Sequence, residues 1–85
     1  MGNSRNVTFV FNASRLDEYQ RGFISGIMYF MTGKPSETYR WYRKCVINYM
    51  DLWYKDLNCT MEQCMNIYNE IEKHFPGVIV EMRSY

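Results

Sequence analysis

One stretch of the chain combines the two kinds of side chain that nucleic-acid binding needs. Residues 40–44 read Arg-Trp-Tyr-Arg-Lys, so positively charged groups are interleaved with aromatic rings. Arginine and lysine neutralise phosphates, and aromatic rings stack on unpaired bases. The run therefore favours RNA or single-stranded nucleic acid as one class of ligand.

The element that carries this run decides which of its side chains can act together. A capping serine followed by apolar residues at helical spacing predicts a helix from Ser36 to about Lys55. On that helix Arg40, Trp41 and Lys44 share the outward side, whereas Tyr42 points into the core. These three residues are the candidate nucleic-acid contacts.

Trp41 supports a second interpretation of the same helix. It lies near Cys45 and Leu52, which gives the helix a second apolar strip opposite its core side. Either another helix covers this strip, or Trp41 is an exposed aromatic anchor that binds a protein partner.

Patterns for catalysis and metal binding are missing from the sequence. Cys45, Cys59 and Cys64 lack CxxC spacing, and His74 is the only histidine. There is no phosphate-binding loop, no GxSxG and no HExxH. His74 is explained more simply as a residue at the end of a helix, where a positive charge interacts favourably with the helix dipole. We therefore expect no catalytic residue, no metal and no cofactor, and a protein that is not an enzyme.

The composition indicates one small globular domain spanning residues 1–85. Apolar residues make up 47% and aromatic residues 18% of the chain, which is ample for a core, and the formal net charge is only +1. No apolar run reaches the roughly 18 residues of a membrane span, and residues 1–11 do not resemble a secretory signal. We therefore expect a cytoplasmic protein that has no contact with a membrane.

The order of elements predicts an α+β domain with three helices packed on a two-stranded sheet. Alternating apolar residues predict strands at Arg5–Phe11 and Val78–Met82. Between them we expect helices at about 15–31, 36–55 and 61–74, which gives the order β-α-α-α-β. A two-stranded sheet is marginal and has open edges, so a homo-oligomer is expected.

Turn and cap residues support these boundaries. Ser14 followed by Asp17 predicts the start of the first helix, and Thr60 followed by Gln63 forms a capping box for the third. Cys59 and Cys64 occupy the two positions of a hydrophobic staple around that box, which assigns them a packing role.

The first helix carries more apolar residues than one core-facing side requires. Its main apolar arc, predicted to face the core, consists of Leu16, Tyr19, Phe23, Ile27 and Phe30, and Ile24 and Met31 widen it. Met28 and Tyr29 fall outside that arc and are candidates for partner binding. The same helix contains Gly22 and Gly26, which are costly in a helix unless another backbone packs closely against them.

In composition the chain resembles the small accessory proteins of large, AT-rich bacteriophages. The likeness lies in its brevity and in its Tyr-, Asn-, Met- and Ile-rich segments, such as residues 48–50 and 65–69. The resemblance implies a protein that binds and blocks a host enzyme or defence component, sometimes together with RNA.

These observations together predict a binding or inhibitor protein that occludes a macromolecular partner, and we expect this partner to be a protein. The alternative is a protein that binds RNA or single-stranded nucleic acid. The candidate partner-binding residues are Arg40, Trp41, Lys44, Leu52, Met28 and Tyr29.

Overall fold

The computed structural model describes residues 3–34, 41–45 and 51–84. It contains an α+β fold with two α-helices and a four-stranded sheet. The strands are β1 (Arg5–Asn12), β2 (Trp41–Cys45), β3 (Asp51–Cys59) and β4 (Ile79–Ser84). The helices are α1 (Glu18–Thr32) and α2 (Met61–His74), and a short 3-10 turn, η1 (Ala13–Arg15), follows β1.

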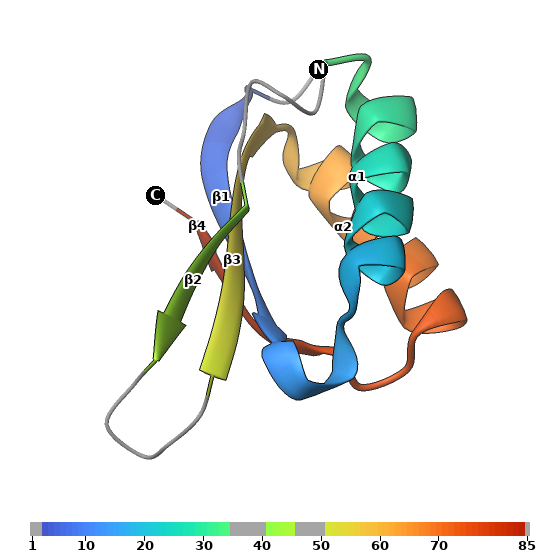
Figure 1. Ribbon diagram of the computed structural model, residues 1–85. Helices are drawn as coiled ribbons and strands as arrows, with labels where there is room; N and C mark the ends of the chain where they lie inside the picture. The colour runs from blue at the N-terminus through green and yellow to red at the C-terminus, as the bar shows by residue number, and fades with distance from the viewer. Residues whose placement is uncertain (1–2, 35–40, 46–50, 85) are drawn as a thin grey trace.

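The sheet is antiparallel throughout and has the order β2-β3-β1-β4. Both helices lie side by side on one face of it, which gives two layers (Figure 1). The element order β-α-β-β-α-β is that of split β-α-β, or ferredoxin-like, domains. This topology serves many unrelated functions, so the function has to be argued from the surface.

The expectation of three helices on a two-stranded sheet is wrong. The segment predicted as the middle helix, residues 36–55, instead holds β2 (41–45) and the first part of β3 (51–59), which pair with each other. The pairing aligns Tyr42 with Tyr54, so two aromatic rings stack across the strands. Aromatic residues fit a pleated sheet at least as well as a helix.

The two layers enclose one main core. Alternate residues of β1 and β3 point toward the helices, and Ile24 and Met28 of α1 and Ile67 and Ile71 of α2 cover them. The buried strand residues of this core include Val7, Phe9, Phe11, Leu57 and Cys59. This main core therefore lies between the sheet and the helices.

Helix α2 confirms the features expected of it. Thr60 and Gln63 form the capping box, and the helix ends at His74, whose ring lies 3.2 Å from Glu70 Oε1. Cys59 and Cys64 are both buried. Burial raises the pKa of the Cys59 thiol to about 11 and also raises that of Cys64, so both thiols stay protonated at neutral pH.

Helix α1 begins three residues later than the sequence suggested. Ser14 belongs to η1, and the N-cap of α1 is Asp17, which exchanges hydrogen bonds with Gln20 in a capping box. The helix ends at Thr32, and its C-cap, Gly33, adopts the left-handed conformation.

No helix among the residues that the structure describes is long and apolar enough to cross a membrane.

Candidate interaction surface

Helix α1 is rotated relative to the sequence-based expectation. Ile24 and Met28 face the core, whereas Tyr19, Phe23 and Phe30, which were assigned to the core, are exposed. Their exposed fractions are 77%, 37% and 83%, and neighbouring Tyr29 is 52% exposed. The aromatic members of the apolar arc that the sequence directs inward therefore lie at the surface, whereas Leu16 is buried and Ile27 packs against the core.

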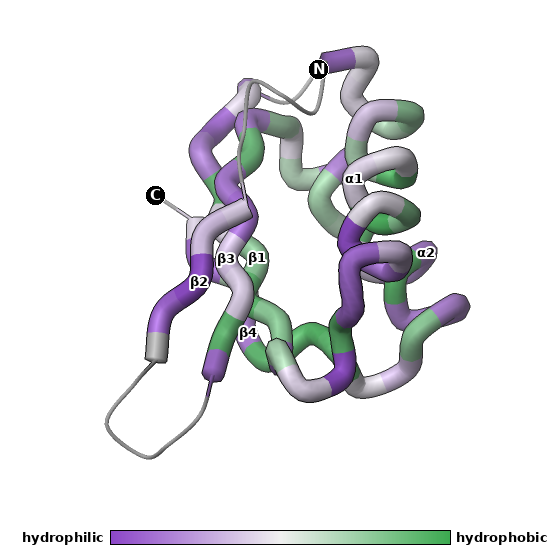
Figure 2. Tube along the Cα trace, viewed as in Figure 1, coloured by the Kyte–Doolittle hydropathy of each residue, from purple (hydrophilic) through white to green (hydrophobic). Residues whose placement is uncertain are grey.

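Six exposed residues form what we call the α1 face: Tyr19, Gly22, Phe23, Gly26, Tyr29 and Phe30. The whole helix contains only two charged residues, Glu18 and Arg21, both near its start. Figure 2 shows this distribution, because the tube of α1 is pale to green beyond its first turns. Surface helices normally carry charged and polar residues on their outer side, so this face is unusually apolar.

The two glycines leave a bare strip along the middle of this face. A Cβ atom added at Gly22 or Gly26 would meet nothing within 4 Å among the described residues. The expected close packing of another backbone against them is therefore not found in the described part of the chain. Each glycine destabilises the helix by about 1 kcal/mol relative to alanine. Since no described residue packs closely against the strip, nothing in the described fold offsets this cost.

Two hollows flank the glycine strip. One, of about 520 Å³, lies along α1 toward Glu70 of α2 and is lined mainly by apolar side chains. Its lining residues are Phe23, Gly26, Ile27, Phe30, Met31 and Glu70. The second, of about 490 Å³, lies between α1 and the start of β2. Gly26 lines both hollows, so it forms the ridge between them.

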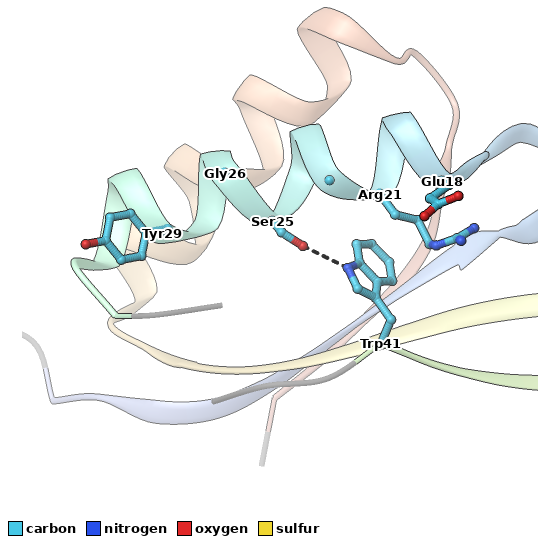
Figure 3. A pocket seen from close by; sticks show the side chains of 7 residues that line it. Glu18, Arg21, Ser25, Gly26, Tyr29 and Trp41 are labelled. Atoms are coloured by element: carbon cyan, nitrogen blue, oxygen red, sulfur yellow. Dashed lines mark hydrogen bonds between the residues drawn. The ribbon is translucent and has the colours of Figure 1, made fainter. Parts of the chain in front are cut away.

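Figure 3 shows the second hollow, with Glu18 and Arg21 at one end and Tyr29 at the other. The Trp41 ring rises from the sheet toward α1, where its Nε1–H donates to Ser25 Oγ at 2.8 Å. This hydrogen bond ties the edge strand β2 to the helix. Trp41 therefore forms a wall of the hollow and joins the two layers.

Trp41 is half-buried against other aromatic rings. Its ring centroid lies 5.1 Å from that of Phe11 and 6.3 Å from that of Trp53. The ammonium of Lys55, which is buried on the same side of the sheet, lies 5.3 Å from the Trp41 ring. Burial lowers the pKa of Lys55 because it penalises the charged form, and the nearby Asp56 carboxylate opposes this shift.

The basic and aromatic run does not form one patch. Because strand residues alternate between faces, Trp41 and Arg43 lie on the helix side of β2, whereas Tyr42 and Lys44 lie on the opposite side. Arg43 forms an ion pair with Asp51, whose pKa it lowers by hydrogen bonding. The expected grouping of Trp41 with Lys44 on one outward side is therefore wrong, and Arg40 lies outside the described residues.

The other candidate residues are also separated. Leu52 is buried on the sheet face that points away from the helices, and Met28 is in the main core. Tyr29 alone among the candidates lies on the α1 face. The sequence signal for this face was the apolar run at residues 27–31, which surrounds the helix on nearly every side.

The sheet face opposite the helices carries a second aromatic group. Tyr42 and Tyr54 stack with ring centroids 5.2 Å apart, and Lys44 Nζ lies 5.7 and 5.4 Å from the two rings. Asp56 accepts hydrogen bonds from Thr8 at 2.7 Å and from Tyr42 at 3.1 Å. Tyr54 is buried, so Tyr42 and Lys44 provide most of the accessible surface of this group.

Within residues 3–34, 41–45 and 51–84, no three His, Cys, Asp or Glu side chains are placed to hold a metal ion. Comparison of the chain with protein-family models, with curated proteins and with solved structures found no match.

Proposed function

We propose that this protein is a binding protein that occludes a protein partner by docking the α1 face against it. The observation that carries the proposal is the exposure of Tyr19, Tyr29 and Phe30 on a face without any charged residue. Aromatic side chains dominate the binding energy of protein interfaces, and charged residues are depleted at their centres. Nucleic acid is a poor fit to the same face because it offers no cation to phosphate.

The resemblance in composition to bacteriophage accessory proteins suggests the kind of partner. Such a protein acts in the cytoplasm, and its partner is a host enzyme or a defence component. An aromatic face blocks such a partner by covering it, and this requires no catalytic residue on the protein itself.

Phe30→Asp tests this proposal. Phe30 is the most exposed of the large apolar residues, so the substitution leaves the fold intact but places a charge at the centre of the docking face. Loss of an aromatic hot spot costs at least about 2 kcal/mol of binding, which is roughly a thirtyfold loss of affinity. We expect the wild-type protein, immobilised on beads, to retain a specific protein from a nuclease-treated bacterial lysate, and the variant to lose it.

Val80→Asp is the matched control, because Val80 is an exposed apolar residue on the edge strand β4. This control should retain the same protein as the wild type. Equal retention by Phe30→Asp would contradict the proposal, and so would loss of all retained protein after nuclease treatment.

A second candidate function is the binding of single-stranded RNA on the opposite sheet face. It is favoured by the stacked Tyr42 and Tyr54 rings with Lys44 beside them, and by the Arg83 guanidinium 5.9 Å from the Tyr54 ring. Rings that stack on bases and cations that contact phosphates are the usual elements of single-strand binding.

A fluorescent oligouridine measures this second function. If RNA binds there, Tyr42→Ala should weaken binding by roughly 1–3 kcal/mol, because a stacking ring is lost. Lys44→Ala should lower the dependence of log affinity on log salt by about 0.7, because one phosphate contact disappears. Lys73→Ala, an exposed cation on α2, should change neither. Absence of oligouridine binding by the wild type would exclude this candidate.

A further inference from the structure

We propose that, in the free protein, the α1 face is covered by the α1 face of a second copy, with the two helices antiparallel. This proposal uses the same surface as the proposed function but does not depend on the existence of another partner. It implies that a partner and the second copy compete for the α1 face.

The spacing of the exposed residues matches a helix–helix seam. Tyr19, Gly22, Gly26, Tyr29 and Gly33 follow one another at intervals of three and four residues. This is the spacing with which one helix contacts another along a shared seam. Glycines in such a seam let two helices approach closely, which explains an otherwise destabilising pair of glycines in α1.

One antiparallel register makes the face complementary to itself. If Gly26 lies at the two-fold axis, the residue numbers of each facing pair add up to 52. Phe30 of one copy then lies over Gly22 of the other, and Phe23 lies beside Tyr29. Tyr19 lies over Gly33, so every ring of the face meets a glycine or another ring.

The charges at the ends of the helix agree with this register. Glu18 is in the first turn of α1, and Lys34 lies two residues beyond its last residue, Thr32. In the antiparallel arrangement, Glu18 of one copy lies beside the C-terminal end of α1 in the other copy, where Lys34 is located. Lys34 Nζ donates to two oxygens of Asn58, each at 2.9 Å, and an ammonium group has a third hydrogen to donate. The two Glu18 carboxylates lie at opposite ends and do not repel each other.

The area of the face is sufficient for a weak dimer. Aromatic side chains bury roughly 150–250 Å² each when fully covered. With the exposures given above, two α1 faces bury on the order of 1,000 Å² in total, which is near the lower limit for a specific interface. We therefore expect a dissociation constant on the order of 10 µM.

Analytical ultracentrifugation of the purified protein over the micromolar range tests the proposal. The wild type should shift from monomer toward dimer. The double variant Gly22→Ala, Gly26→Ala should raise the dissociation constant at least tenfold, because the added methyl groups hold the helices apart. The same variant should raise the melting temperature of the monomer, since alanine favours the helix and its Cβ meets no clash in the fold.

Asn66→Ala with Asn69→Ala is the matched control, because both asparagines are exposed on α2. This control should leave the association unchanged. A wild type that stays monomeric, or a glycine variant that associates as strongly as the wild type, would overturn the proposal and leave the α1 face to a different protein.

A mixing experiment tests the register. Phe23→Lys and Tyr29→Glu should each prevent self-association, but a mixture of the two should form a heterodimer in which opposite charges meet. A mixture of Phe23→Lys with Tyr19→Glu should stay monomeric, because residue 19 faces residue 33 in this register. Heterodimer formation in both mixtures, or in neither, would overturn the antiparallel arrangement about Gly26.

Because these measurements use the purified protein alone, their failure is distinct from failure to retain a partner from a lysate.

Discussion

Replacing Trp41 with alanine is expected to lower the free energy of unfolding by about 2–4 kcal/mol. Truncation of a fully buried large aromatic residue costs about 3–5 kcal/mol, and Trp41 is half-buried. The substitution removes the ring contacts with Phe11 and Trp53 and leaves Ser25 Oγ without its donor. For a domain of this size, a loss of 1 kcal/mol lowers the melting temperature by roughly 4–8 °C. Urea unfolding followed by circular dichroism measures the effect.

Two further variants separate the contributions to this effect. Trp41→Phe keeps a ring but loses the indole N–H, so it should cost about 1 kcal/mol for the hydrogen bond together with a smaller packing loss. Tyr29→Ala changes an exposed ring that lines the same hollow, and it should alter stability by no more than about 0.5 kcal/mol. If Trp41→Ala left stability unchanged but abolished partner binding, Trp41 would be a surface anchor and the packing described here would be wrong.

The sequence predicted the parts of the fold whose signals are local. The Thr60 and Gln63 capping box placed the start of α2, and strict alternation placed β1. The end of α1 is also local in origin, because its C-cap Gly33 has a positive φ that glycine adopts readily. In each case the residues that determine the structure lie within one turn or one strand.

The segment predicted as the middle helix could not be assigned correctly from the sequence, because its structure depends on distant pairing. Strand β3 is held by β1 on one side, where Phe9 pairs with Lys55 across 46 residues of sequence. A window of about 20 residues contains no information on that partner. Apolar residues at intervals of three and four within the segment matched a helix equally well, and the four-stranded sheet decided between the two.

The candidate site was only partly predictable for a related reason. Helix α1 carries apolar residues on two opposite arcs, so periodicity alone cannot say which arc faces the core. The sequence identified Tyr29 as a surface residue but assigned Phe23 and Phe30 to the core. In the structure Ile24 and Met28 pack in the main core, whereas the rings of Tyr19, Tyr29 and Phe30 are exposed.

Met28 and Phe30 provide a direct test of this rotation, because the sequence and the structure predict opposite results for them. Met28→Ala should lower the free energy of unfolding by about 3 kcal/mol, since it leaves a cavity in the main core. Phe30→Ala should change it by no more than about 0.5 kcal/mol, because the ring is mostly in solvent. Both variants are compared with the wild type by urea unfolding at a concentration low enough to keep the protein monomeric, since association would add to the apparent stability.

Ile24→Ala is the control for this comparison, because Ile24 lies one turn before Met28 on the same buried side and should cost about as much. The reverse order, with Phe30→Ala strongly destabilising and Met28→Ala nearly neutral, would mean that the aromatic stripe faces the core. In that case the α1 face would not exist as a docking surface, and neither partner binding nor self-association could depend on it. The expected order instead means that the rings of Tyr19, Tyr29 and Phe30 stay largely exposed without a role in the core, which is what a surface kept for binding requires.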